Sequence, residues 1–394
     1  MANILDYLDW RGDLTLSERP FNEVDNLILA EICYLDFSGF APASFAVQTV
    51  TLQDAANAYF AAHPTTDMGV LVPDQIPVLV ERAAKTARFG DIRLLGYVNR
   101  IDAETQTQFS AMTMLLPDGS AYVAFRGTDD TIVGWKEDFN MAFTPEIPAQ
   151  KYACAYLQQA AKALPFRPLL VGGHSKGGNL AVYAAVFCGQ PVQKQLTAVY
   201  NNDGPGFYTS LLPLPAHRAV SDRITTILPE SSVVGMLLAH EERYQVVRST
   251  QIGLMQHDGF SWLVKGERFE HLTELAEGGR IMDQTLKILF AGAHRAPARA
   301  VCRHALCHSH VHRRKHAHRL KRRRAQDGLC NGQGPAIARQ AHAKGPFRYA
   351  AAASQIRGAV GPRRAGRVEA AQQQAPRGCR RISGEPQPRL KNCL

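Results

Sequence analysis

The first 300 residues are poor in cysteine. They contain only Cys33, Cys154 and Cys188, each in apolar surroundings, whereas the other five cysteines fall after residue 300. Three scattered cysteines do not form the disulfide framework of a small secreted domain. We therefore expect three reduced side chains that belong to a hydrophobic core.

The sequence also shows no pattern typical of a targeting or membrane segment. No stretch reaches the roughly 18 uncharged apolar residues that a membrane helix needs. Residues 1–6 contain no basic region followed by an apolar one, so they do not resemble a signal peptide. These absences predict a cytoplasmic protein without a transmembrane segment, and they leave the oligomeric state open.

Positive charge is scarce until the last quarter of the chain. Residues 301–394 hold 21 Lys and Arg against 3 Asp and Glu, a net charge of +18, whereas residues 1–300 carry a net charge of −8. The overall charge of +10 therefore describes the tail. Because the body is acidic, we expect no nucleic acid to bind it.

Residues 1–90 are mainly helical in pattern. Apolar residues recur at helical spacing over Glu23–Leu35, Leu52–Ala62 and Pro73–Ala87. No motif in this part suggests chemistry. We expect an N-terminal helical flank or cap that packs on the sheet that follows it.

Strand patterns begin at residue 91 and alternate with helical ones. An antiparallel meander is predicted first, with a turn at Leu116–Gly119, and a helix over Ala149–Ala163 comes next. The predicted strands are Ile92–Val98, Thr107–Leu115, Ala121–Phe125, Pro168–Val171, Thr197–Asn201, Arg223–Leu228 and Tyr244–Ser249. This alternation predicts an α/β domain over residues 91–292, with a mostly parallel central sheet and helices on both faces.

One pentapeptide stands at a strand-to-helix junction. Gly173, Ser175 and Gly177 form a Gly-x-Ser-x-Gly motif between the apolar run Pro168–Val171 and a helical run, Leu180–Cys188. This context is typical of the nucleophile elbow of the α/β-hydrolase fold, where a serine sits on a sharp turn. Ser175 is therefore the candidate nucleophile.

A serine nucleophile needs a histidine base and usually a carboxylate that orients it. In α/β-hydrolases these follow in the order Ser, acid, His. His257 lies a short loop after the last predicted strand, where this order places the base. We exclude His174, because the elbow turn directs its side chain elsewhere.

Several motifs together resemble the class 3 lipase family. They are Val123–Thr128, Trp135 with Asp138, Gly173–Gly178, and His257 near an aromatic pair. Two further stretches, Asn202–Phe207 and Met255–Asp258, resemble a bacterial branch of lipase-like proteins with a domain of unknown function. The resemblance spans roughly residues 1 to 290.

The resemblance implies a lipase- or esterase-like serine hydrolase. It would cleave a carboxylic ester of a small acyl or lipid substrate through an acyl-enzyme, and it would need no cofactor. Thr128 would supply one oxyanion donor through its hydroxyl or backbone N–H, and the backbone N–H of Lys176 would supply the other. A non-catalytic lipase-like binding protein, and a thioesterase or amidase with the same triad, are the alternatives.

The chain departs from the family in two places. Lys176 stands where an apolar residue is common, which predicts a cation beside the site. The usual aspartate position falls at Ser232. Asp203, after the preceding strand, is our preferred substitute, and Glu230 is the alternative acid.

Three aspartates follow the third predicted strand. Asp129, Asp130 and Asp138 lack the ligand spacing of a metal site, so we expect a solvated loop and no metal. Asp138 could instead form a buried salt bridge that stabilises the Arg126 loop.

The tail, residues 293–394, is basic and has no helical periodicity, so we expect it to be disordered. A nucleic-acid-binding arm, a Cys and His zinc site around Cys302–His310, and a frameshifted reading frame all fit its composition. We favour the frameshift. Back-translated with suitable codons and shifted by one base, Arg303–Leu320 becomes an amphipathic segment with a glycine stop signal.

The frameshift hypothesis predicts an insertion or deletion of one or two bases near codons 290–296. Resequencing the source DNA tests it. An intact frame, together with a tail that resists protease, would contradict the hypothesis.

Overall fold

The computed structural model describes residues 1–276 except 47, 70, 71, 130, 142, 143, 145, 208–211, 213 and 241. The end of the predicted α/β domain and the whole tail of residues 293–394 lie outside the described residues.

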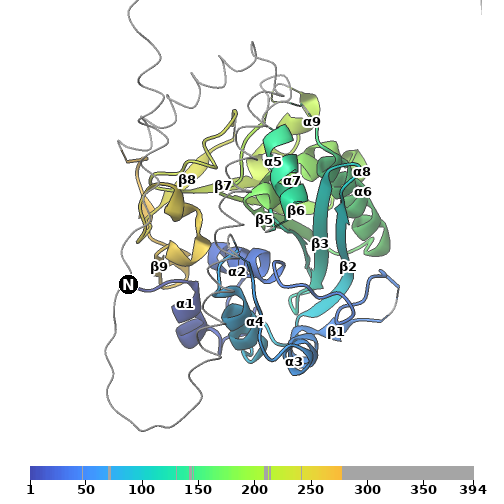
Figure 1. The fold of residues 1–394 in the computed structure, drawn as a ribbon, viewed down its shortest axis with the longest axis vertical. Helices are drawn as coiled ribbons and strands as arrows, with labels where there is room; N and C mark the ends of the chain where they lie inside the picture. Colours follow the sequence, from blue (N-terminus) through green and yellow to red (C-terminus); the bar gives the residue numbers. More distant parts are fainter. Residues whose placement is uncertain are drawn as a thin grey trace, which may run out of the picture. The chain divides into compact units, whose positions relative to one another are not determined.

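A nine-stranded sheet crosses the described part of the chain (Figure 1). In spatial order its strands are β1 (Val50–Thr51), β2 (Arg93–Asp102), β3 (Thr107–Leu115), β4 (Ala121–Phe125), β5 (Leu169–His174), β6 (Leu196–Asn202), β7 (Ile224–Pro229), β8 (Tyr244–Val247) and β11 (His271–Leu272). Strands β2 to β4 form the predicted antiparallel meander, and β4 to β8 are parallel neighbours. A separate small hairpin joins β9 (Val264–Lys265) and β10 (Arg268–Phe269).

Helices lie between the strands and before them. The helices are α1 (Ile4–Arg11), α2 (Glu23–Ile32), α3 (Leu52–Ala62), α4 (Ile76–Ala84), α5 (Ile132–Met141), α6 (Pro148–Ala163), α7 (Lys176–Phe187), α8 (Gln190–Gln193) and α9 (Pro215–Arg218). Three short 3-10 turns are η1 (Ser221–Arg223), η2 (Gly253–His257) and η3 (Gly259–Ser261). The sequence pattern did not predict α1 or α5.

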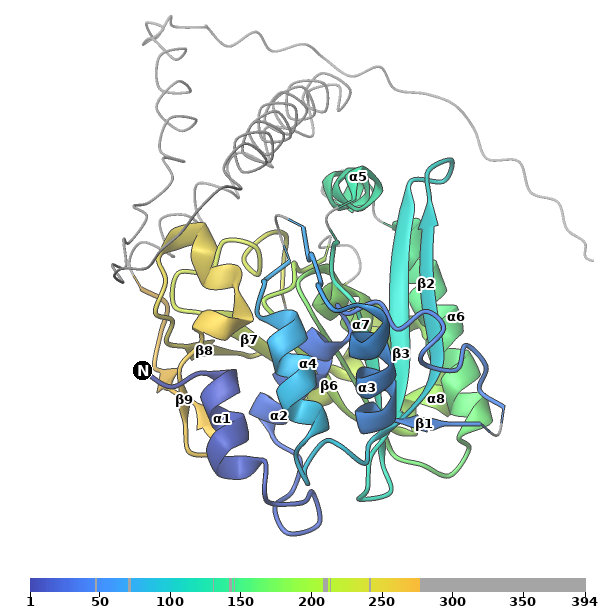
Figure 2. The ribbon, with the colours of Figure 1, turned by 60° about the horizontal axis from the view of Figure 1, so that its bottom comes forward.

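The alternating side chains of β4 show which helices pack on each face of the sheet. Tyr122 and Ala124 pack into one hydrophobic core with α1 to α4, and Val123 and Phe125 pack into a second core with α6 and α7. Successive residues of a strand point to opposite faces. The fold is therefore an α/β-hydrolase fold with helices on both faces of its central sheet, and α1 to α4 cover one face (Figure 2).

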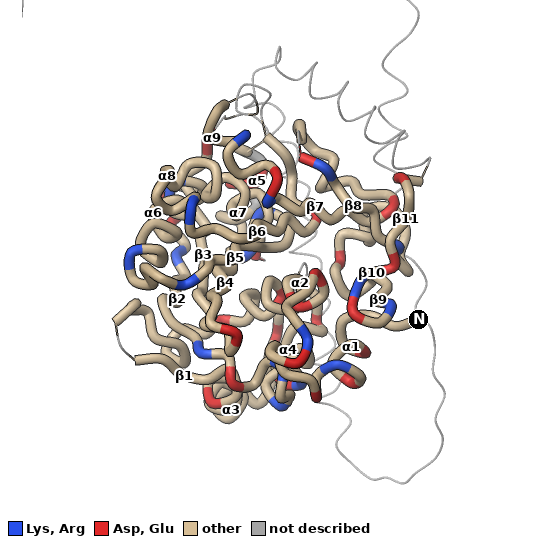
Figure 3. Tube along the Cα trace, turned by 180° about the vertical axis from the view of Figure 1, so that it is seen from behind, with Lys and Arg blue, Asp and Glu red and all other residues tan. Residues whose placement is uncertain are grey.

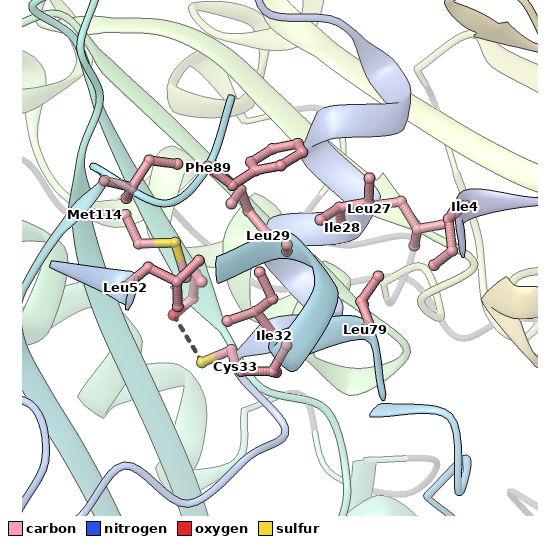
Figure 4. Packing of buried hydrophobic residues seen from close by; sticks show 14 of the residues in the cluster. Ile4, Leu27, Ile28, Leu29, Ile32, Cys33, Leu52, Leu79, Phe89 and Met114 are labelled. Atoms are coloured by element: carbon pink, nitrogen blue, oxygen red, sulfur yellow. Dashed lines mark hydrogen bonds between the residues drawn. The ribbon is translucent and has the colours of Figure 1, made fainter. Parts of the chain in front are cut away.

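Helix α2 is the most buried element of the N-terminal layer. Its apolar residues pack with α4 and β3 (Figure 4), and Cys33, just after the helix, lies with its Sγ 3.8 Å from the Ala124 carbonyl oxygen. Three polar residues of α2, namely Asp25, Asn26 and Glu31, are also fully buried. A helix that buries polar groups inside a core needs partners for them, and these partners lead to the candidate site.

Helices α1 and α4 carry both acidic and basic side chains, whereas α2 and α3 carry acidic ones and no Lys or Arg (Figure 3). In the described part of the chain, none of the helices combines the length and the apolar character that a membrane crossing requires. Cys33, Cys154 and Cys188 are all free, as the sequence predicted.

Candidate active site

The Gly-x-Ser-x-Gly motif forms a sharp turn between β5 and α7. Ser175 has φ 59° and ψ −132°, which is a left-handed conformation that side chains rarely adopt, and its N–H donates to Asn202 O at 2.9 Å. A Cβ on Gly173 would lie 2.4 Å from Phe125 O, and one on Gly177 would lie 2.1 Å from the same atom. Both glycines are therefore required by the close approach of β4 to the turn.

Thr128 and the N-terminus of α7 face the same end of the sheet. Strand β4 pairs with β5 in parallel, so the segment after Phe125 runs beside the elbow. The Thr128 hydroxyl donates to Asp138 Oδ2 at 2.5 Å, whereas the Thr128 backbone N–H has no hydrogen-bond partner among the residues that the structure describes. The N–H of Lys176, the first helical residue, has no hydrogen-bond partner among the described residues.

Asp203 and His257 are brought together. The Nδ1 of His257 lies 2.7 Å from Asp203 Oδ2, and Asp203 is fully buried after β6. Glu230 does not take part in this contact; its Oε1 instead accepts a bond from Ser249 N at 3.4 Å. Of the two candidate acids, only Asp203 therefore reaches the candidate base.

Ser232, at the usual acid position, supports Asp203 instead. Its hydroxyl donates to Asp203 Oδ1 at 2.5 Å, and Gly235 N–H donates to the same oxygen at 3.2 Å. A Cβ on Gly235 would lie 2.3 Å from that oxygen, so a glycine is needed there. Asp203 Oδ1 thus accepts hydrogen bonds from two donors, and Asp203 Oδ2 faces His257 Nδ1.

His257 lies beside the elbow. Its ring centroid is 4.6 Å from that of His174, the residue before Ser175, and its backbone oxygen is 2.7 Å from His174 Nε2. The Ser175 hydroxyl itself has no hydrogen-bond partner in the described part of the structure.

The Lys176 ammonium is buried, and it lies 4.0 Å from Asp138 Oδ1, whose other carboxylate oxygen accepts from the Thr128 hydroxyl. Its side chain is only 2% exposed, and Nζ donates to Glu137 Oε2 at 2.9 Å and to Gln108 O at 3.0 Å. Glu137 lies on α5 and also accepts bonds from Gln108 N and Ala149 N, each at 3.1 Å. The buried ammonium therefore links α7 to β3 and α5 through hydrogen bonds.

Asp138 contacts the Arg126 loop through a hydrogen bond from Thr128 and not through a salt bridge to Arg126. Arg126 donates to Asp129 Oδ2 and to Asn99 Oδ1, each at 3.0 Å, whereas Asp138 accepts from Thr128. Asp130 lies outside the described residues. Within the described ranges, no group of three or more His, Cys, Asp or Glu side chains is arranged to hold a metal ion.

Asn179, on α7, joins the segments around the candidate site, and it was not among the predicted site residues. Its Nδ2 donates to Pro205 O and Gly206 O, each at 3.0 Å, and its Oδ1 accepts from Gln150 Nε2 at 2.8 Å. These bonds fix the loop that follows Asp203 onto the helix that follows Ser175. A lone asparagine in an otherwise apolar helix was the available signal.

The N-terminal layer also contributes polar contacts, although no chemistry was expected of it. Asn26 Nδ2 donates to Asn202 Oδ1 at 2.8 Å, and Asn202 Nδ2 donates to Gly173 O at 3.0 Å. Tyr34 and Glu31 lie near His174, with Tyr34 Oη 3.3 Å and Glu31 Oε1 3.5 Å from its Nδ1. Helical periodicity marked this segment as core and did not show which polar groups it would meet.

A family model described as Mbeg1-like matches residues 83–301. No curated protein matches the chain by sequence.

Several solved lipase structures are similar to part of this chain at low identity. The M37 lipase is 16% identical over 55% of this chain and 70% of its own, with a TM-score of 0.34. Lipase II from Rhizopus niveus is 13% identical over 56% and 80% of the two chains, with a TM-score of 0.33. The Rhizomucor miehei lipase in its propeptide complex is 18% identical over 52% and 71%, with a TM-score of 0.31. Likeness at this level leaves the roles of the site residues to the geometry of this chain.

Replacing Lys176 by Met should destabilise the protein, because it leaves the Glu137 carboxylate buried without its cation. Removing one partner of a buried ion pair costs about 3–5 kcal/mol, and urea denaturation would measure this loss. The double variant Lys176→Met/Glu137→Gln removes both charges and should recover part of it.

Lys85→Met is the matched control, since Lys85 forms an exposed pair with Glu81. Exposed pairs contribute less than about 1 kcal/mol. A Lys176→Met variant as stable as the Lys85→Met variant would contradict the role given to the buried pair.

Proposed function

We propose that this chain, which belongs to the Mbeg1-like family, is a serine hydrolase that cleaves carboxylic esters through an acyl-enzyme. One observation carries the proposal most: Asp203 and His257 form a 2.7 Å contact beside the strained turn that bears Ser175. A histidine oriented by a buried carboxylate next to an elbow serine is the arrangement that acyl transfer requires.

In the proposed reaction, Ser175 Oγ attacks the acyl carbon and its proton passes to His257 Nε2. His257 Nδ1–H donates to Asp203 throughout, and the carboxylate stabilises the imidazolium that forms. The backbone N–H groups of Lys176 and Thr128 donate hydrogen bonds that stabilise the negative charge on the carbonyl oxygen. His257 returns the proton to the leaving alcohol, and water then releases the acid by the same steps in reverse order.

The substrate is an acyl compound, either small or lipid-like. A thioester or an amide would use the same residues, so the leaving group is an experimental question. A series of p-nitrophenyl esters of increasing chain length, compared with matched thioesters and amides, would rank these substrates by kcat/KM.

A fluorophosphonate probe should label the wild-type chain at Ser175, because the probe reacts with serines activated by a histidine base. Ser175→Ala should abolish both labelling and hydrolysis of p-nitrophenyl acetate. Ser38→Ala, which changes an exposed serine near Asp36, is the matched control and should label as wild type does. A folded wild-type chain that does not label would favour the non-catalytic binding protein.

Asp203→Asn should lower kcat about 10⁴-fold, because the amide cannot hold the imidazole in its productive tautomer. Steady-state hydrolysis of p-nitrophenyl acetate measures the effect. Glu230→Gln, which changes the rejected acid, should keep kcat within about twofold of wild type, as surface substitutions usually have small effects. If Glu230→Gln caused the large loss and Asp203→Asn did not, the acid would be Glu230.

A further inference from the structure

A second buried histidine contacts the candidate base. His174 is 5% exposed, and its Nε2 lies 2.7 Å from the backbone oxygen of His257. A carbonyl oxygen can only accept a hydrogen bond, so Nε2 must carry a proton. In a neutral imidazole, Nδ1 is then an acceptor that needs a donor of its own.

Two groups from the N-terminal layer face that acceptor. Tyr34 Oη lies 3.3 Å and Glu31 Oε1 lies 3.5 Å from His174 Nδ1. Glu31 is fully buried, and neither of its oxygens has a hydrogen bond within normal distance among the described residues. An unpartnered buried carboxylate would be very costly, whereas a protonated carboxyl could donate to Nδ1.

The electrostatic surroundings favour neutral forms of both groups. Burial, and the nearby Asp258 carboxylate, raise the pKa of Glu31 well above its ordinary value. Burial, and the charge on His257, lower the pKa of His174 well below its ordinary value, against the opposing effect of the His257 carbonyl. Both shifts favour the neutral forms, in which Glu31 can donate and His174 Nδ1 can accept.

The segment that carries His257 has little burial of its own. Turn η2 and the residue before it expose three large apolar side chains, with Ile252 at 83%, Leu254 at 57% and Met255 at 60% exposed. Its anchors include Gln256, whose side-chain oxygen accepts from Ser231 N at 2.7 Å, and the bond from His174 to His257 O. Asp203 also contacts the His257 ring, and Trp262 Nε1 donates to Gln256 O at 2.9 Å, so the bond from His174 is one of several contacts that position the base.

We propose that His174 is a positioning residue for the base. Its neutral imidazole, with the tautomer set by Tyr34 and Glu31, donates to the His257 backbone and holds the base against the elbow. This inference rests on the proposed hydrolase function. It also requires His174 to stay uncharged, because a second cation with its ring 4.6 Å away would disfavour the imidazolium that His257 forms during acyl transfer.

The test compares His174→Gln with His174→Met. These side chains have similar volume, but only glutamine places an N–H near the position of Nε2. We expect His174→Met to lower kcat for p-nitrophenyl acetate about 10- to 100-fold with KM unchanged, since a misplaced catalytic group costs rate without weakening binding. His174→Gln should recover most of the loss.

His63→Met is the matched control. His63 also stacks on an aromatic ring, Tyr59, and its Nδ1 also contacts a backbone carbonyl, at 3.0 Å, but it lies on the exposed end of α3. The kcat of the His63→Met variant for p-nitrophenyl acetate should equal that of the wild type. If His174→Met is folded and as fast as His174→Gln, the positioning role is wrong.

A measurement on the wild type keeps the proposal testable if a His174 variant does not fold. Imidazole ¹⁵N chemical shifts should report a protonated Nε2 and an unprotonated Nδ1 for His174 between pH 6 and 8, and a doubly protonated ring in that range would overturn the proposal. Wild-type labelling by fluorophosphonate is checked first. Its absence would refute the hydrolase function, whereas labelling with His174 charged would refute only the positioning role.

Discussion

The strained backbone of Ser175 is the constraint on which the site depends. A non-glycine residue at positive φ costs of the order of 1–3 kcal/mol and persists only where its surroundings enforce it. Here the turn is enforced by the bond from Ser175 N to Asn202 O and by the close approach of Gly173 and Gly177 to Phe125 O. Three adjacent strands, β4 to β6, therefore determine where the hydroxyl points.

The N-terminal layer takes part in the same constraint. Asn26 on α2 bonds to Asn202, which in turn bonds to Gly173 O, so α2 reaches both strands that flank the turn. A polar group buried without a partner costs about 1–3 kcal/mol, and these two hydrogen bonds give partners to four polar groups. The helices before residue 90 thus pack on one face of the sheet, and α2 also contacts the strands next to the elbow. This argues against treating them as a separable cap.

Sequence patterns predicted strands β2 to β8, the elbow, and His257 with Asp203 or Glu230 as its acid, because these features have local periodicity or a fixed order along the chain; the two-residue strands β1, β9, β10 and β11 are too short to show such a pattern. They could not predict where Lys176 points. A lysine after the nucleophile suggests a cation at the mouth of the site, but its partner Glu137 lies on α5, which had no recognisable pattern. Glu31 and Tyr34 were not predicted as site residues for a related reason. Periodicity shows which side of a helix is buried but not which residues that side contacts.

The acid position is the point at which this chain departs most from the pattern it resembles, and the geometry explains how. Asp203 N donates to Ile227 O at 2.9 Å, so the end of β6 lies against β7, and Ser232 just beyond β7 reaches Asp203 Oδ1. A carboxylate at position 232 would therefore lie within hydrogen-bond distance of Asp203. Two carboxylates that close cannot both stay ionised. If Asp203 is the acid, as proposed, position 232 must supply a donor to it, which is what Ser232 does.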